Sequence, residues 1–524
     1  MVCDYCDKCQ ESEQIVNIQV QVPSDFYPGR SSPQDVDDTS VDGTLETPSP
    51  VSDIHLSLDL EDSTLLRATR LVHVLEGRGK HLKANSLARD FSAEEATVLI
   101  NKSHNVEQID VFISHCWQDH HTPKVFALLI HSNLRAAVCI SAIVACISAS
   151  LCRIGVLPKI RQSDGFAFFP WALLFGSSTF FLILMTWHRV RDRCSFSTQY
   201  FLDKFCVHQE DDTLKERGVR SFAAFVAASD RMVLLWSPTY FTRLWCTLEM
   251  AAMVKVAGSR GLRMDLIPLQ LAKVSIYSWL VQAIIYFMVQ ANRLADAPIP
   301  DFPFVVAVVF VGGYFMAMTL REYARDRKAL EQQLSTFSME EALCSSPRDR
   351  RWIERTMKRW FADMDVCNKH IQQGVRAQVM ALLGPEAHYA TSLACPTFLI
   401  NVFNEADYVA GQHYDERTSE RAAAATGWAA FILIVLPLIY KICFAFAEKR
   451  SSRKMEMVVN IALSAFVVLC IGAVFHTCFQ WASKGVLEQW TWVVPIALLL
   501  MALWLQRASF CFARCSNMGQ SKRT

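Results

Sequence analysis

One carboxylate follows an apolar stretch in a way that is typical of a ligand site. The run Met232–Trp236 is apolar throughout, and Glu249 follows it in the pattern Trp245-Cys246-x-x-Glu249. Ligands of open α/β sheets bind at the carboxyl ends of the strands, so a helix after such a strand brings Glu249 near that edge. A carboxylate there could hold a sugar hydroxyl and stabilise positive charge on the ring, as in glycoside hydrolysis. The competing interpretation is that Glu249 only solvates the start of its helix, where acidic residues are favoured.

A second group of side chains that could bind a ligand or a metal follows the short β-rich run Asp110–Ser114. It consists of His115, Cys116, Trp117, His120 and His121. The histidines and the cysteine are too closely spaced for a standard structural zinc site, so we expect no metal. Trp117 has two open interpretations, a ring that stacks on an aromatic ligand and a cover for the sheet edge.

Short apolar stretches alternate with helical ones around these residues. Strands are expected at Asp110–Ser114, Gln199–Phe205, Met232–Trp236 and Leu262–Leu269, and helices at Lys124–His131, Arg220–Ala228 and Phe241–Val256. Strands that alternate with helices in this way predict a parallel α/β sheet.

Long apolar blocks interrupt this pattern. The chain is 52% hydrophobic and 20% charged, and blocks of about 20 apolar residues suit membrane-spanning helices. The expected spans cover residues 134–151, 166–187, 274–289, 302–320, 422–446, 458–479 and 493–512. The net charge of +1 gives no argument for a nucleic-acid partner.

Basic residues near the span ends predict the orientation. Clusters at 189–193 and 321–328 place the segments that follow them in the cytosol. With one span between residues 321 and 449, however, the basic turn at 449–454 would fall on the opposite side, against the same rule.

The amino-terminal part differs in composition. Residues 1–62 are acidic and rich in Ser, Pro, Asp and Thr, which predicts a disordered tail. Cys3, Cys6 and Cys9 leave three interpretations open: palmitoylation, a loose metal site or an unligated end. Residues 63–105 are expected to be a helical lead-in, and their basic side chains either face solvent or contact lipid headgroups.

The two runs resemble a known family. Asp110-Val-Phe-Ile-Ser114 looks like the opening strand of Toll/interleukin-1 receptor-like (TIR) domains, and Phe201-Leu-Asp203 resembles the second strand. Ser229–Glu249, which includes Trp-Cys-x-x-Glu, resembles the third strand and its helix. The resemblance covers about 110–131 and 196–270, and it implies a flavodoxin-like sheet.

The resemblance also implies a site. Some TIR domains assemble with one another, and others cleave NAD with the glutamate that matches Glu249. Ser114, Trp117, Asp203 and Trp245 are then the expected contacts of the nucleotide, with NAD as substrate and no required cofactor. The loop after the first strand departs from the family pattern, which favours binding over catalysis.

Together these features predict a TIR-like domain that transmembrane hairpins interrupt. The expected parts are the tail 1–62, the lead-in 63–105, TIR-like segments 106–131 and 196–270, hairpins 132–190 and 271–320, a cytosolic helical segment 321–421 that could complete the TIR-like domain, transmembrane helices 422–512 and a tail 513–524.

Three functions remain open for such an integral membrane protein. The favoured one is a membrane-anchored signalling protein whose cytosolic domain binds other TIR-like domains, as a homo-oligomer for example. The others are an NAD-cleaving hydrolase that uses Glu249, and a channel or transporter with a regulatory TIR-like domain. The scarcity of ionisable residues in the spans argues against proton-coupled transport.

Overall fold

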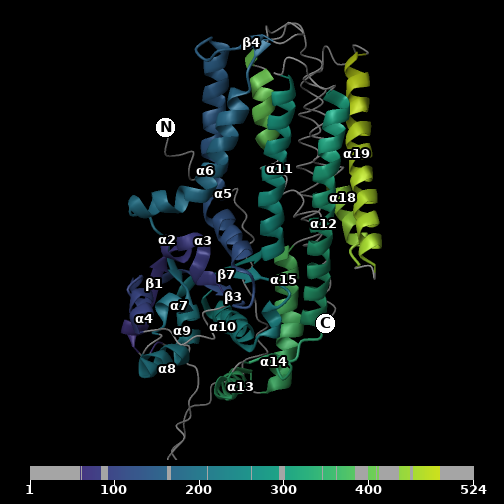
Figure 1. Cartoon of the computed structure of the whole chain (residues 1–524). Helices are drawn as coiled ribbons and strands as arrows, with labels where there is room; N and C mark the ends of the chain where they lie inside the picture. Colours follow the sequence, from purple (N-terminus) through teal and green to yellow (C-terminus); the bar gives the residue numbers. More distant parts are fainter. Residues whose placement is uncertain are drawn as a thin grey trace, which may run out of the picture. The chain divides into compact units, whose positions relative to one another are not determined.

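The computed structural model of the chain falls into two compact units, which are described separately. It describes residues 60, 62–83, 93–161, 167–208, 211–260, 263–293, 301–344, 346–361, 363–383, 399–408, 410–411, 436–448 and 452–483. Unit 1 comprises Met1–His121, Ser197–Leu266 and Gln332–Leu382, and unit 2 comprises Thr122–Phe196, Ile267–Glu331 and Leu383–Thr524 (Figure 1). The expected disordered tail, except for residues 60 and 62, and the expected span 493–512 with the tail 513–524 lie outside the described residues.

Unit 1 is built on a six-stranded sheet in the order β2-β1-β6-β3-β7-β8. The strands are β1 (Arg67–Arg70), β2 (Ser103–Asn105), β3 (Ile109–His115), β6 (Gln199–Phe201), β7 (Ser229–Trp236) and β8 (Arg263–Pro268). At its centre, β3 pairs in parallel with β6 on one side and with β7 on the other. The residues from Met232 to Trp236 are all buried, as expected of a strand that is covered on both faces.

The sheet is mixed, which corrects the expectation of a parallel sheet. β1 pairs antiparallel with both β2 and β6, and both added strands come from the segment 63–105 that was expected to be helical. With four and three residues, these strands are too short to show an alternating pattern. The basic side chain of Arg67 donates to Ser103 Oγ (2.9 Å) and to the Ser103 carbonyl oxygen (2.7 Å), and so joins the two strands.

Helices and an aromatic core complete unit 1. The helices are α2 (Leu71–Val74), α3 (Glu76–Gly79), α4 (Ala93–Ile100), α7 (Asp203–Cys206), α8 (Asp212–Arg220), α9 (Phe222–Ala227), α10 (Leu244–Arg260), α13 (Pro347–Phe361), α14 (Met364–His370) and α15 (Arg376–Leu383). Phe112 of β3 stacks on Phe201 of β6 with 4.8 Å between ring centroids, and the edge of Phe222 meets Phe112 at 5.6 Å. These contacts pack α9 against the parallel part of the sheet.

Unit 2 contains most of the long helices. They are α5 (His121–Arg153), α6 (Trp171–Arg193), α11 (Leu269–Arg293), α12 (Asp301–Ser335), α18 (Leu436–Ala445) and α19 (Arg453–Ser483), with the short strands β4 (Ile160–Arg161) and β5 (Ala167–Phe168) between α5 and α6. In the described part of the chain, three helices (α5, α6 and α11) are long and apolar enough to cross a membrane. The first and third expected spans lie within α5 and α11, the second lies on α6 from Trp171 onward, and the fourth lies within α12.

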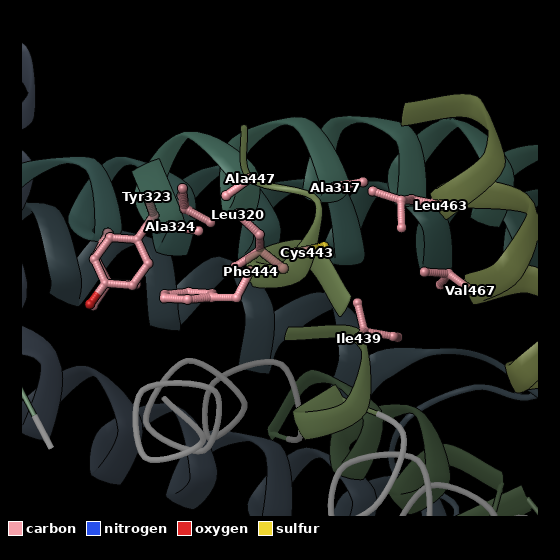
Figure 2. Packing of buried hydrophobic residues seen from close by; sticks show 12 residues of the cluster. Ala317, Leu320, Tyr323, Ala324, Ile439, Cys443, Phe444, Ala447, Leu463 and Val467 are labelled. Atoms are coloured by element: carbon pink, nitrogen blue, oxygen red, sulfur yellow. The ribbon is translucent and has the colours of Figure 1, made fainter. Parts of the chain in front are cut away.

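Two apolar clusters hold unit 2 together. One contains Phe180 and Leu184 of α6 with Ile276 and Trp279 of α11. The other joins α12 to α18 and α19, as Figure 2 shows. Its labelled members are Ala317, Leu320, Tyr323, Ala324, Ile439, Cys443, Phe444, Ala447, Leu463 and Val467.

The helical residues 399–408 belong to the expected segment 321–421 and pack within unit 2. Ile400 and Phe403 belong to the cluster with α6 and α11. Asp407 accepts hydrogen bonds from the backbone nitrogens of Ala172 (2.7 Å) and Leu173 (2.8 Å) in the first turn of α6. These residues are therefore bound within the helical unit.

Candidate functional site

The candidate carboxylate lies where the two central strands end. Glu249 is on the second turn of α10, which follows β7 through a short 3-10 turn, Tyr240–Thr242. Ser114 is the penultimate residue of β3 and pairs with Leu234 of β7. The Glu249 side chain is enclosed, because only 8% of the residue is exposed.

A chain of hydrogen bonds starts at Glu249 and ends on the backbone of α10. The Ser114 hydroxyl bonds to the Glu249 carboxyl and to the Tyr240 hydroxyl, and the Tyr240 hydroxyl donates to the carbonyl oxygen of Cys246 at 3.3 Å. Each hydroxyl has one hydrogen to donate. If Glu249 is protonated and donates to Ser114, then Ser114 can donate to Tyr240 and Tyr240 to Cys246, and all three bonds are satisfied.

Burial favours this protonated form. Loss of solvation raises the pKa of Glu249 from 4.5 to about 8, although the hydrogen bond from Ser114 acts in the opposite direction. Burial likewise raises the pKa of Tyr240 well above its ordinary value, and the neighbouring Glu249 adds to the effect. At neutral pH the enclosed network therefore consists of a carboxylic acid and two neutral hydroxyls.

Two thiols adjoin this network. A hydrogen bond from the Cys246 thiol lowers the pKa of Cys116 to about 6, and the same interaction raises the pKa of Cys246 well above its ordinary value. The Cys246 sulfur also lies 3.7 Å from the carbonyl oxygen of His115. Both thiols are buried. The interaction favours the thiolate form of Cys116 over that of Cys246, and the sequence spacing gave no reason to expect that the two cysteines interact.

Trp117 and Asp203 form a second pair beside Glu249. The Trp117 indole nitrogen donates to Asp203 Oδ2 at 3.0 Å, and the Lys204 ammonium lies 5.8 Å from the Trp117 ring centroid. The charge of Asp203 is one of the causes that raise the pKa of Glu249. The structure therefore places Ser114 in contact with Glu249 and the charge of Asp203 close enough to act on it, whereas Trp117 is joined to the site through Asp203.

Trp245 lies apart from this group. Its indole nitrogen donates to Asp349 Oδ2 of α13 at 3.2 Å, and its ring meets Phe222 at 5.7 Å. Its contacts therefore connect α10 to α13 and α9. They do not include the groups around Glu249.

Asp119 joins the loops after β3 and β7. Asp119 accepts hydrogen bonds from the hydroxyls of Ser237 and Thr239, each at 2.6 Å. The sequence also does not point to Tyr240, because nothing in Ser237-Pro-Thr-Tyr240 indicates that this side chain bonds to Ser114 of β3. Among the residues that the structure describes, no group of three or more His, Cys, Asp or Glu side chains could hold a metal ion.

No family model matches this chain, and neither a curated protein nor a solved structure matches it.

Proposed function

We propose that the chain is a membrane-anchored signalling protein whose unit 1 is a TIR-like, flavodoxin-like domain that acts by association. In chain order β3, β6, β7 and β8 are the first to fourth strands, and they lie in the order second, first, third, fourth. This is the order of the first four strands of flavodoxin-like sheets, and the residues that the structure describes add no fifth strand beyond β8. The antiparallel strands β1 and β2 are an addition at the edge.

Three long apolar helices support the anchor. We infer that α5, α6 and α11 cross a membrane together with α12, which contains the fourth expected span and returns the chain to unit 1. Unit 1 then lies on the cytosolic side, because basic residues occupy the last turns of α6 and lie within α12. The bilayer and further copies of the domain are then the partners.

The enclosure of Glu249 is the observation that favours association over catalysis. The acid of the Trp-Cys-x-x-Glu motif is bound to Ser114 and is only 8% exposed. A domain that works only by binding its like needs no accessible acid, so this carboxyl can serve the interior of the fold.

Cross-linking of mixed isotopic copies tests the association. Unlabelled and 15N-labelled full-length chains, reconstituted together, are treated with a lysine-reactive cross-linker, and only mixed-isotope links report contacts between copies. We expect such links at the exposed lysines of unit 1, Lys83 and Lys215, and none at Lys159 of unit 2. Links that arise only in unit 2, or no mixed links, would contradict the proposal.

The location of Glu249 favours a second function, cleavage of NAD. Glu249 lies at the carboxyl ends of β3 and β7, where the chain order of the strands reverses and ligands of such sheets bind. In this reaction water replaces nicotinamide on the ribose carbon, which yields nicotinamide, ADP-ribose and a proton. Glu249 would have to become accessible and ionise to stabilise the positive charge on the ribose.

Release of nicotinamide distinguishes the two functions. The purified full-length protein is compared with Glu249→Ala and with Glu249→Gln, which keeps the size of the side chain. Turnover in the parent that both substitutions abolish would reject the binding-only function. Absence of turnover, also after the protein is clustered on vesicles, would reject the enzyme.

A further inference from the structure

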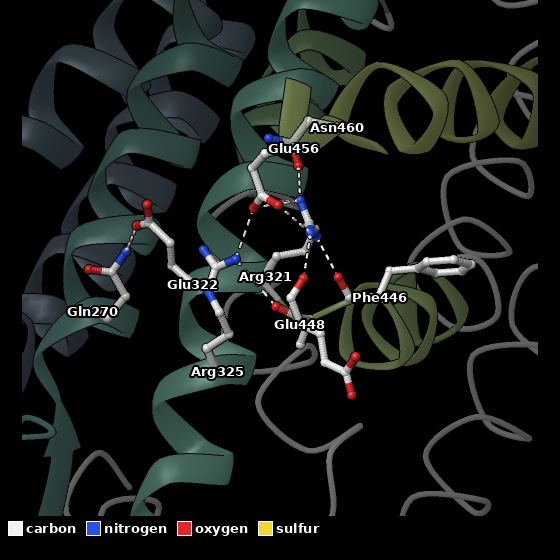
Figure 3. Close-up of polar contacts among 9 residues, drawn as sticks. Gln270, Arg321, Glu322, Arg325, Phe446, Glu448, Glu456 and Asn460 are labelled. Carbon is white, nitrogen blue, oxygen red and sulfur yellow. Dashed lines mark hydrogen bonds and ion pairs between the residues drawn. The ribbon is translucent and has the colours of Figure 1, made fainter. Parts of the chain in front are cut away.

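The turn between α18 and α19 is bound to α12 through one buried arginine. Arg321 of α12 is 0% exposed, and its guanidinium donates to the carbonyl oxygen of Phe446 at 2.7 Å and to Asn460 Oδ1 at 2.6 Å (Figure 3). It also lies 3.0 Å from Glu456 Oε1. The end of α18 and the start of α19 therefore meet α12 at this residue.

Arg325, one turn further along α12, repeats the connection. It donates to Glu456 Oε1 at 2.9 Å and to the carbonyl oxygen of Ala447 at 3.3 Å. Cations at a helix carboxyl terminus are favourable, because the last carbonyl groups carry partial negative charge. Both arginines thus hold the turn beside the part of α12 that leads into unit 1 after Glu331.

Residues 399–408 lie at the opposite end of the helical unit from the contacts of Arg321. Asp407 binds the first turn of α6, whereas the last turn of α6 leads into unit 1 at Ser197. At about 1.5 Å per residue, the 23 residues of α6 separate these ends by roughly 35 Å. The chain leaves unit 1 after Leu382. By Asp407 it lies at the end of the helical unit where α6 begins, and by Phe446 it is back at the end that carries Arg321.

This path brings the basic turn at 449–454 into agreement with the rule that basic residues lie on the cytosolic side. With an even number of crossings between residues 321 and 449, the turn shares the side of α12 that carries the other basic residues. Residues 321–328 and 448–456 together contain eight basic and four acidic side chains. The shared end of the helical unit is therefore positively charged.

We propose that this end is a binding edge for anionic lipid headgroups, on the same side of the membrane as unit 1; the membrane placement rests on the proposed function. Lys328 follows Arg325 by three residues, and Arg453 precedes Glu456 by three, so each lies on the same helix face as a residue of the Arg325–Glu456 ion pair. The side chains of Lys328, Arg453 and Lys454 are exposed.

The apolar residues that follow Arg453 and Lys454 also suit a lipid-binding edge. Met455, Met457 and Val458 are exposed apolar side chains at the start of α19. Basic side chains that reach headgroups beside apolar side chains that enter the acyl region are typical of a membrane interface. The charge excess selects anionic lipids, and each basic residue near such a surface contributes about 1 kcal/mol.

Labelling of native lysines tests the side. Full-length protein in sealed vesicles is treated with a membrane-impermeant amine reagent, and modified lysines are identified by mass spectrometry. Lys328 and Lys454 should be labelled together with Lys215 of unit 1, and Lys159, between α5 and α6, only after the vesicles are opened, or the reverse if the vesicles are inverted. Labelling of Lys454 together with Lys159 would overturn the shared side, whatever unit 1 does.

A matched pair of variants tests the lipid. Arg453→Gln/Lys454→Gln removes two exposed charges from the edge, and Arg153→Gln/Lys159→Gln removes two exposed charges after α5. After extraction from vesicles of equal phosphatidylserine and phosphatidylcholine, we expect only the first variant to lose its excess of phosphatidylserine, by up to about fivefold per charge. Equal retention by both variants would overturn the binding edge, and it would leave the association of unit 1 untouched.

Discussion

The hydroxyl of Ser114, at the end of β3, bonds to the carboxyl of Glu249 on α10, although 135 residues separate the two in the chain. The bond joins the central strand of the sheet to the helix that follows the neighbouring strand. It also places an acid and a hydroxyl in an enclosed environment, where their protonation affects stability.

Glu249→Gln should stabilise the protein more as the pH rises. The pKa of Glu249 is about 8 in the fold and 4.5 in its ordinary state, so between these values the unfolded chain releases a proton that the folded chain keeps. The parent therefore loses free energy of unfolding from about pH 4.5 to pH 8, on the order of a few kcal/mol, and the variant does not. Thermal unfolding at several pH values measures the difference.

Glu340→Gln is a control of opposite sign. A hydrogen bond from Ser338 lowers the pKa of Glu340, so the parent gains stability from this group above the ordinary pKa and loses it as the pH falls through the lowered value. Its substitution should slightly destabilise the protein at neutral pH. If Glu249→Gln had the same effect as Glu340→Gln, the protonated form of Glu249 would be refuted.

Cys246→Ala should raise the pKa of Cys116 from about 6 towards the ordinary value of 9.0. The Cys246 thiol supplies the hydrogen bond that stabilises the Cys116 thiolate, and alanine removes that donor. Cys246→Ser keeps a donor at the same position and should preserve a low pKa. Thiolate absorbance against pH, as the difference from Cys116→Ser, measures it, and equal curves for the two variants would contradict the assignment.

Arg321→Gln should destabilise unit 2 far more than Arg325→Gln. Arg321 is fully buried, and its replacement leaves the carbonyl oxygens of Phe446 and Glu448 without this donor and Glu456 with Arg325 alone, a loss of up to about 3–5 kcal/mol. Arg325 is partly exposed, and exposed ion pairs contribute about 1 kcal/mol or less. Thermal unfolding in detergent gives both values; similar losses would show that Arg321 is not the main link.

Asp407→Ala should loosen the first turn of α6. Pro170 precedes this helix and supplies no side-chain cap, so Asp407 takes that role from elsewhere in the chain. Loss of a helix cap costs roughly 1–2 kcal/mol. Asp407→Asn keeps one acceptor oxygen and should lose less. Hydrogen exchange at Ala172 and Leu173 reports the effect directly, and unchanged exchange in the alanine variant would exclude the cap.

The sequence predicts the central strands but not the edge of the sheet. Met232–Trp236 is apolar enough to indicate a buried strand without further information, and β7 covers it. β1 and β2 are short and polar, and in the fold β1 pairs with both β2 and β6 while Arg67 binds Ser103 and Asn105. Such pairing depends on tertiary contacts that no local pattern contains.

The site divides in the same way. The sequence predicts that Ser114 and Glu249 lie at the same edge of the sheet, because the carboxyl ends of parallel strands lie at one edge. Tyr240 and the Cys116–Cys246 pair depend on the path of a three-residue turn and on the rotation of α10. Trp245 and Glu249 belong to one motif and are neighbours on α10, four residues apart. Their side chains nevertheless bind different partners.

The insertion of α5 and α6 between β3 and β7 has a consequence for biosynthesis. β3 ends at His115 and β7 begins at Ser229. At roughly 5–20 residues per second, a ribosome takes on the order of ten seconds to make the intervening chain. The strand Ile109–His115 must wait through that interval, while two long apolar helices emerge. Completion of the central strand pair is therefore delayed until the first helical pair exists, so an error in placing that pair would arrest the sheet before its core could form.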